Sequence, residues 1–261
     1  MVIFFDIDGT LVDDKTQILP QSAADAVRAL VARGHIPVVN TGRPYSHLDP
    51  RIRALPFAGW ICSGGQEIFL QEKWLKKEVI PAIWLPEVIR QVRQYGMQVV
   101  YEAEGGFYLD ETHPYQHPEI AFQCDLIRRH GGYVRYLEEG IEHPFVKFCV
   151  FDAPNCRKEA FIAAVEDRFE CILRRGMVEL LVKGNSKAVG LDMMLRELGC
   201  PLEQTMAFGD SANDLPMLQA VGTAVCMGGG AEVAKAAADF VTRTVLDDGI
   251  AYALRHYGII E

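Results

Sequence analysis

Two aspartates near the start of the chain have a type and spacing that suit carboxylate chemistry. The segment Asp6–Thr10 places two carboxylates two positions apart, directly after a short apolar run. Residues i and i+2 share one face of an ideal strand, so Asp6 and Asp8 would repel one another. A divalent cation held by oxygen ligands would offset that repulsion. Taken alone, the segment also fits a solvated Asp-Gly turn.

A second acidic segment, Gly209–Asp214, follows another apolar run. Asp210 is the expected third contact of a magnesium ion, and Asn213 or Asp214 would complete or orient the shell around it. Aspartate and asparagine also favour the N-cap of a helix, and both interpretations can hold at once.

Two further segments supply groups that bind anions. Thr41, Gly42 and Arg43 follow an apolar run, and a hydroxyl, a backbone amide and a basic side chain at a strand end can bind phosphate oxygens. The alternative is a helix cap followed by a surface arginine. Lys187 follows the expected cap Ser186, and a cation in the first turn opposes the helix dipole by about 0.3–1 kcal/mol. Surrounding carboxylates or a bound phosphate would reverse that penalty, whereas the alternative is an exposed lysine.

The elements that must position these groups alternate between short apolar runs and amphipathic helical patterns. Ligands bind beyond the carboxyl ends of the strands in an open parallel sheet, which is where the acidic segments fall. The alternation predicts an α/β fold, with a mostly parallel, Rossmann-like sheet and helices on both faces. The predicted strands are Val2–Phe5, Ile36–Val39, Trp60–Cys62, Thr205–Phe208, Ala224–Cys226 and Phe240–Val241, with a hairpin at Ile68–Leu75. The predicted helices lie near Ala24–Val31, over Lys187–Leu198 and Ala231–Ala237, after Asn213 and near Leu246–His256.

The middle of the chain has a different texture, with more strands and frequent aromatic residues. We expect an inserted α+β module at 82–182, between a first core part at 1–81 and a second core part at 183–261. Its expected helices are Glu87–Tyr95 and Arg157–Phe169, and its expected strands are Gln98–Tyr101, Phe107–Leu109, Tyr133–Leu137, Phe145–Phe151 and Met177–Val182. His113 and His117 lie in a Pro-rich stretch without a cysteine pair, so a surface loop is favoured there over a zinc site.

The bulk composition bounds the classes of function. The 261 residues carry a formal net charge of -9, which disfavours nucleic acid and anionic membranes as partners. No stretch approaches the roughly 20 apolar residues that span a bilayer, and the first residues read as a buried strand rather than a signal peptide. The seven cysteines form no CxxC pair, which favours reduced thiols in a cytoplasmic protein.

The four segments together resemble the motifs of the haloacid dehalogenase superfamily, in the same order. They are Asp6–Thr10, Thr41–Arg43, Lys187 and Gly209–Asp214, and the inserted module lies between the second and third. That arrangement is similar to the Cof-type phosphatases, which carry a cap of type C2B. The resemblance covers the whole chain, closely in the core and faintly in the cap.

The resemblance implies a role for each of these residues. Asp6 would attack phosphorus and form an aspartyl-phosphate, and Asp8 would protonate the leaving oxygen and then activate water. Mg²⁺ would be held by Asp6, the backbone carbonyl of Asp8 and Asp210. The remaining roles are phosphate binding by Thr41, Gly42, Lys187 and Asn213, substrate binding by Arg43, and support by Asp214 and Thr10.

Two segments depart from the Cof-type pattern, and both bear on loop shape and specificity. Ser63–Gly65 stands where an Asn-Gly pair is usual, and Met227–Ala231 replaces a Met-Gly-Asn-Ala stretch. The implied substrate is a small phosphorylated metabolite such as a sugar phosphate, and the oligomeric state, monomer or homodimer, is left open. A phosphotransferase or mutase on the same scaffold is the alternative enzyme, and a non-catalytic sugar-phosphate sensor is the alternative from another class.

Overall fold

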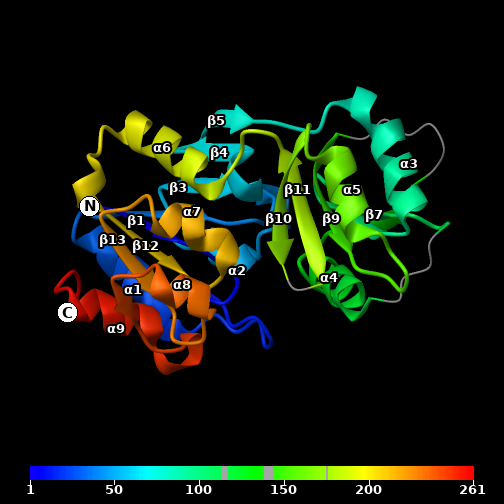
Figure 1. Ribbon diagram of the computed structural model, residues 1–261. Helices are drawn as coiled ribbons and strands as arrows, with labels where there is room; N and C mark the ends of the chain where they lie inside the picture. The colour runs from blue at the N-terminus through cyan, green and yellow to red at the C-terminus, as the bar shows by residue number, and fades with distance from the viewer. Residues whose placement is uncertain (113–116, 138–143, 175) are drawn as a thin grey trace. The chain divides into compact units, whose positions relative to one another are not determined.

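The computed structural model describes residues 1–112, 117–137, 144–174 and 176–261 (Figure 1). These residues form two compact units. The first unit comprises Met1–Gly42, Pro50–Lys76 and Ser186–Glu261, and the second comprises Arg43–Asp49 and Lys77–Asn185. The boundaries drawn from the sequence at 81 and 182 stay a prediction.

The first unit is built on an eight-stranded sheet with β1 (Val2–Phe5) among its central strands. The strand order is β14-β13-β12-β1-β2-β3-β4-β5. Neighbouring strands from β14 to β3 are parallel, and β4 is antiparallel to β3. The other strands are β2 (Ile36–Asn40), β3 (Gly59–Cys62), β4 (Glu67–Leu70), β5 (Lys73–Lys77), β12 (Thr205–Gly209), β13 (Thr223–Cys226) and β14 (Phe240–Val241).

Helices cover both faces of this sheet (Figure 1). On one face, α6 (Lys187–Leu198), α7 (Leu215–Leu218) and α8 (Glu232–Ala236) share a core with alternate side chains of the strands. On the other face, α1 (Gln21–Ala32) contacts β2 and lies beside α9 (Gly249–His256). The short helix α2 (Pro50–Arg53) follows β2 in the chain. This arrangement confirms the predicted α/β class with a largely parallel sheet.

The second unit has its own six-stranded sheet, in the order β10-β11-β9-β6-β7-β8. Its paired strands are antiparallel except β7 and β8. Helices α3 (Leu85–Tyr95) and α5 (Lys158–Val165) contribute to one apolar core together with side chains of the sheet. Helix α4 (Pro118–Arg129) packs with other side chains of the sheet in a second core. The strands are β6 (Gln98–Ala103), β7 (Gly106–Leu109), β8 (Tyr133–Tyr136), β9 (Phe145–Phe151), β10 (Phe169–Arg174) and β11 (Met177–Val182). The expected α+β module is therefore present as a separate sheet with helices.

Two elements of the second unit differ from the sequence-based expectation. The helix expected to reach Phe169 ends at Val165, because Phe169–Arg174 pairs antiparallel with β11 as strand β10. The Pro-rich stretch expected to be a surface loop leads directly into α4, a helix that the sequence did not predict and whose N-cap is His117. The imidazole of His117 accepts a hydrogen bond from the Glu119 amide at 3.3 Å, so this side chain caps the helix. His113, the other histidine of that stretch, lies outside the described residues.

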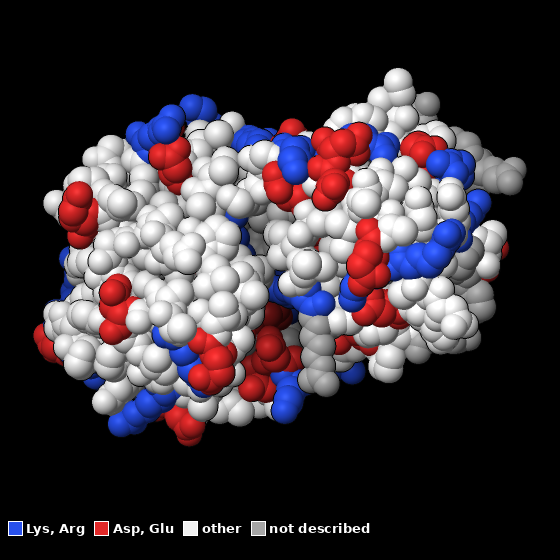
Figure 2. All heavy atoms as spheres, viewed as in Figure 1, with Lys and Arg blue, Asp and Glu red and all other residues white. Residues whose placement is uncertain are grey.

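Charged side chains of both signs are interspersed over the face shown in Figure 2. Within the described residues, no helix is both long enough and apolar enough to cross a membrane.

Candidate active site

The two acidic segments meet at the carboxyl ends of two adjacent parallel strands. Phe5 of β1 lies in register with Phe208 of β12, so Asp6 and Asp210 follow neighbouring strand ends. The Asp6 amide donates to the Phe208 carbonyl at 3.0 Å, which continues the strand pairing by one step. Asp6 is 3% exposed and Asp210 is 9% exposed. The parallel pairing therefore brings the first and last predicted motifs together in a buried site.

Gly9 is what lets the first loop approach Asp210 so closely. Its φ of 74° lies in the left-handed region, and a Cβ added to it would collide with the Asp210 carboxylate. Any side chain at this position would need both a strained backbone and a displaced carboxylate. The Asp-Gly step of the first segment is thus explained by the position of Asp210, and a solvated turn is not what the structure shows.

The stretch Met227–Ala231, one of the departures from the Cof-type pattern, contacts the backbone of Asp210. The Ala231 amide donates to the Asp210 carbonyl at 2.7 Å. A Cβ on Gly230 would lie 2.7 Å from the same carbonyl oxygen, so only glycine permits this approach. The glycine-rich sequence therefore fixes the backbone of Asp210, a role that sequence reasoning did not assign.

The side chain of Lys187 contacts two carboxylates of the same group. It is the first residue of α6, and its N-cap Ser186 accepts a hydrogen bond from the Val189 amide. The Lys187 Nζ donates to Asp6 Oδ1 at 2.6 Å and to Asp214 Oδ1 at 2.5 Å. Lys187 is therefore buried among carboxylates and is not the exposed lysine of the alternative interpretation. Its predicted role in phosphate binding stays a prediction.

Asp214 is fully buried and fully engaged. One carboxylate oxygen accepts from Lys187, and the other accepts from the amides of Asp210 at 2.9 Å and Ser211 at 3.0 Å. Ser211 and Asp214 also form a capping box over the short turn Ala212–Asp214. The N-cap is Ser211, where an aspartate or asparagine was expected, and Asp214 joins it as the third residue of the turn. The same Asp214 side chain thus serves the helix cap and the acidic cluster, and its role beside a magnesium ion stays a prediction.

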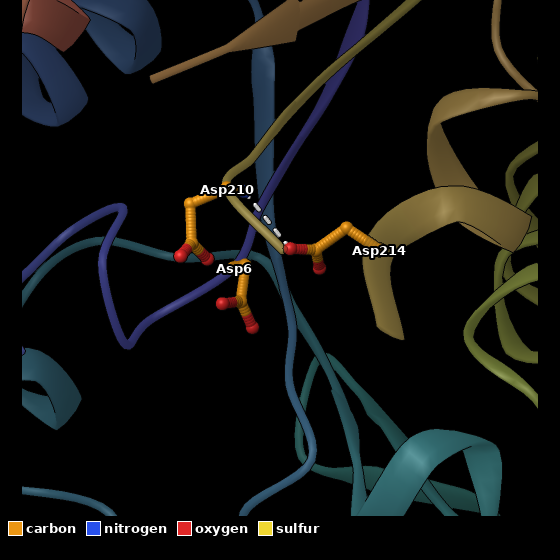
Figure 3. A group of neighbouring side chains, drawn as sticks. All are labelled: Asp6, Asp210 and Asp214. Atoms are coloured by element: carbon orange, nitrogen blue, oxygen red, sulfur yellow. Dashed lines mark hydrogen bonds between the residues drawn. The ribbon is translucent and has the colours of Figure 1, made fainter. Parts of the chain in front are cut away.

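Three carboxylates lie close enough to hold one cation. Asp6, Asp210 and Asp214 each offer an oxygen, and these oxygens lie within 4.8 Å of one another (Figure 3). Among the described residues, the buried Asp210 Oδ1 has no hydrogen-bond partner, whereas Asp214 has its oxygens occupied. An acceptor of this kind fits a hard divalent cation, which prefers oxygen ligands. The side chain of Asp8 is outside this group; its expected contribution was a backbone carbonyl.

The crowding of negative charge shifts the pKa values of these side chains. Burial and then Asp214 raise the pKa of Asp6 to about 7, against the opposing pull of Lys187. Burial and then Asp6 raise the pKa of Asp210 to about 9. Burial lowers the pKa of Lys187, but Asp214 and Asp6 outweigh it and hold that pKa above its ordinary value. One lysine thus leaves the carboxylates under-compensated, and a cation would relieve this.

The remaining predicted residues lie near the strand ends and loops that form this centre. Thr41 is buried directly after β2, and its amide donates to the Ile61 carbonyl at 2.8 Å. Thr10 is buried, and its hydroxyl has no hydrogen-bond partner among the described residues. Asn213 is buried and accepts from the Ser211 hydroxyl at 2.5 Å.

Arg43 differs from the other predicted site residues because it groups with the second unit. The division between the units falls between Gly42 and Arg43, within the predicted phosphate-binding motif. The following residues are anchored inside the second unit, where Ser46 Oγ accepts from the Gly105 amide at 2.9 Å and His47 Nε2 lies 2.8 Å from the Ala103 carbonyl. The expected role of Arg43 in substrate binding stays a prediction.

The parallel sheet, the buried carboxylates at its strand ends and the buried lysine define an α/β enzyme with an acidic active site. The chain belongs to the haloacid dehalogenase-like hydrolases, whose family model matches residues 3–254. This result confirms the resemblance drawn from the four motifs.

Two curated relatives, a putative phosphatase and a pyridoxal phosphate phosphatase, match this chain along nearly their full length. The putative phosphatase YkrA of Bacillus subtilis is 30% identical, covering 100% of this chain and 98% of the relative. The pyridoxal phosphate phosphatase YbhA of Escherichia coli is 28% identical, covering 96% of each chain.

Solved structures place the fold in the same group. The HAD subclass IIB sugar phosphatase BT4131 superposes with a TM-score of 0.84 at 28% identity, covering 99% of both chains. BT1666 of Bacteroides thetaiotaomicron, a phosphatase of the same superfamily, superposes with a TM-score of 0.82 at 29% identity, covering 99% of this chain and 95% of its own. The chain is therefore an enzyme, a hydrolase of the phosphatase type.

Proposed function

We propose that the enzyme is a Mg²⁺-dependent phosphatase that hydrolyses a small phosphate monoester through an aspartyl-phosphate on Asp6. The observation that carries this proposal is the contact of the Lys187 ammonium with both Asp6 and Asp214, beside the under-compensated Asp210. A buried carboxylate, a lysine ammonium and an acceptor without a hydrogen-bond partner among the described residues lie together, which is the set of groups that the proposed nucleophile, phosphate contact and metal ligand require. Phosphoryl transfer depends mainly on such positioning and charge compensation.

The metal would be held by the carboxylates of Asp6 and Asp210 and by the backbone carbonyl of Asp8. When bound, Mg²⁺ supplies positive charge that lets a carboxylate and a phosphate approach one another. Asp214 would position Lys187 and the Asp210 backbone, because its own oxygens are already engaged.

The reaction would proceed in two steps on the side chains of the chain. An oxygen of Asp6 attacks phosphorus, the bond from phosphorus to the leaving oxygen breaks, and Asp8 gives its proton to that oxygen. Water then attacks the phosphorus of the aspartyl-phosphate while Asp8 takes the water's proton, and the bond from phosphorus to the Asp6 oxygen breaks. Inorganic phosphate leaves and the Asp6 carboxylate is regenerated. Thr41, the Gly42 amide, Lys187 and Asn213 would hold the phosphoryl oxygens, and Thr10 would brace the loop.

The relatives support a small substrate. BT4131 is a sugar phosphatase and YbhA is a pyridoxal phosphate phosphatase, so both act on small phosphorylated molecules. We therefore propose a phosphorylated metabolite of similar size, with Arg43 as one of its contacts. The acidic chain, with its formal net charge of -9, accords with a small-molecule partner.

A turnover assay tests the proposal. Purified enzyme should release phosphate from p-nitrophenyl phosphate, or from members of a phosphosugar panel, with Mg²⁺ but not with EDTA. An Asp8→Asn variant quenched in acid should retain a phosphoryl group on Asp6 that mass spectrometry detects. Transfer of phosphate to an added sugar, in place of release to water, would instead support a phosphotransferase.

A further inference from the structure

Asn40, the last residue of β2, is a buried polar side chain for which the proposed mechanism has no use. It is 0% exposed. Its Nδ2 donates to the backbone carbonyl of Lys187 at 3.0 Å. Its Oδ1 is buried and has no hydrogen-bond partner among the described residues. A buried polar group that is only half satisfied costs stability, and such groups occur where function requires them.

This hydrogen bond is made to the backbone of a lysine whose side chain belongs to the candidate active site. Lys187 begins α6, and its Nζ must reach Asp6 and Asp214 at the same time. The ammonium is held at the far end of a long side chain with several rotatable bonds. A second hold on the backbone of Lys187 fixes the near end of that chain, which limits how far the ammonium can move.

The first turn of α6 is also held from another direction. A Cβ on Gly65 would lie 2.5 Å from the Ser186 carbonyl oxygen, so the bare backbone of Gly65 packs against the cap residue of the helix. Gly65 has a φ of 97°, which glycine adopts without strain. Gly65, which follows β3, thus packs against the cap residue Ser186, and Asn40 of β2 bonds to the first residue of α6.

We infer that Asn40 is a positioning residue, which fixes the backbone of Lys187 so that its ammonium meets the phosphoryl group and both carboxylates. The inference rests on the proposed function for the identity of the ligand, a phosphoryl group. A purely structural Asn40 would stabilise the fold without affecting the ligand.

The test uses three single variants, one double variant, and inorganic phosphate as the probe, in the full-length enzyme with Mg²⁺. Asn40→Leu removes the amide while keeping a similar volume, and Asn40→Ala is the truncation that accompanies it. We expect Asn40→Leu to unfold at a temperature close to that of the wild type. Both variants should bind phosphate about tenfold more weakly, because the ammonium that meets the phosphoryl group is no longer held in position before it binds.

Measuring the effect of Asn40→Ala in a Lys187→Met enzyme shows whether Asn40 acts through the lysine ammonium. The backbone carbonyl at position 187 remains, so Asn40 still donates its hydrogen bond, and the effect of Asn40→Ala on unfolding should be the same in both backgrounds. The effect on phosphate affinity should disappear, because the ammonium that Asn40 positions is gone. Additive stability together with non-additive phosphate affinity is the expected signature.

Three results would overturn the inference. Phosphate affinity of Asn40→Leu within twofold of the wild type would do so. An equal loss of affinity in the Lys187→Met background would show that Asn40 acts independently of the lysine. A wild-type enzyme that binds no phosphate would overturn both the inference and the proposed function, whereas one that binds phosphate but hydrolyses no ester would overturn the proposed function alone.

Discussion

Both units bury charge, but they compensate it differently. In the first unit, Lys187 contacts Asp6 and Asp214, and the neighbouring Asp210 keeps a carboxylate oxygen without a hydrogen-bond partner among the described residues. In the second unit, the carboxylates of Glu102 and Glu179 are matched by the cations of Lys147 and Arg174. The Lys147 Nζ lies 3.3 Å from Glu102 and 3.7 Å from Glu179, and Arg174 Nη1 lies 3.2 Å from Glu179.

The pKa directions follow this balance. Burial raises the pKa of Glu102, but Lys147, His47 and Cys149 outweigh it and leave that pKa below its ordinary value. In the first unit, the pKa of Asp6 rises to about 7 and that of Asp210 to about 9. Burial alone therefore does not make an active site. A surplus of one charge sign distinguishes the group that a cation from solution can complete.

The largest effect is expected at the nucleophile. Asp6→Asn should abolish turnover, because an amide cannot form the acyl-phosphate, while removal of one charge from a crowded group should leave the fold intact. Mg²⁺-dependent release of p-nitrophenol measures the first effect, and thermal unfolding measures the second. Full activity in this variant would refute the mechanism.

Removal of Lys147 tests whether the buried glutamates of the second unit depend on a compensating cation. Lys147→Met leaves Glu102 and Glu179 short of a partner in a buried site, and we expect a loss of about 3–5 kcal/mol in the free energy of unfolding. Urea titration followed by circular dichroism measures this loss. The double variant Lys147→Met/Glu102→Gln is the matched control and should recover part of it. A loss below about 1 kcal/mol in the single variant would mean that the cluster is not balanced as described.

The buried charges of the two units should also respond differently to magnesium and pH. The raised pKa values of Asp6 and Asp210 stabilise the metal-free fold fully only below their ordinary value of 3.8. That contribution is lost as the pH rises through about 7 for Asp6 and about 9 for Asp210. Magnesium needs the deprotonated carboxylates, so its stabilising effect should grow over the same range, to about 2.7 kcal/mol at a concentration of one hundred times Kd.

Unfolding scans with EDTA and with Mg²⁺ across this pH range measure the difference. Asp210→Asn is the control, and it should remove most of the magnesium effect. Glu102 behaves oppositely, because its lowered pKa stabilises the fold above the ordinary value of 4.5, and that stability is lost as the pH falls through its folded pKa. A magnesium effect that is independent of pH would contradict the surplus of charge in the first unit.

The smallest effect is expected for an exposed ion pair. Arg196 and Asp192 lie 2.9 Å apart on the surface of α6, with side chains 80% and 59% exposed. Asp192→Asn should change the free energy of unfolding by no more than about 0.5 kcal/mol, because solvent screens such pairs. Urea titration checks this, and a loss comparable to that of Lys147→Met would remove the distinction between buried and exposed charge.

The first unit could be predicted closely because local signals and fold agree there. The strand Val2–Phe5 and the helix Lys187–Leu198, with Ser186 before it and Gly199 after it, have the predicted bounds. Parallel strands that are buried on both faces give continuous apolar runs, and caps mark the helix ends. The segments that carry Asp6 and Asp210 follow such runs, so their meeting at one edge was predictable.

The second unit was harder because its signals are weaker or belong to distant partners. The helix Pro118–Arg129 begins at a proline and buries Ile120, Cys124 and Ile127 at helical spacing, a pattern that the His/Pro stretch before it obscures. The strand Phe169–Arg174 exists through its pairing with β11. The charge balance around Lys147 depends on strand register, which a single sequence does not reveal.

The position of β1 in the sheet has a consequence for the order in which the enzyme folds. Its neighbours are β2, close behind it in the chain, and β12, near the other end, where Phe5 meets Phe208. A ribosome would therefore release β1 long before the strand that completes its pairing exists. Contacts between such remote segments form slowly, because a long loop must close first. We expect catalytic activity to be among the last properties to appear during refolding, after most of the helical signal has returned.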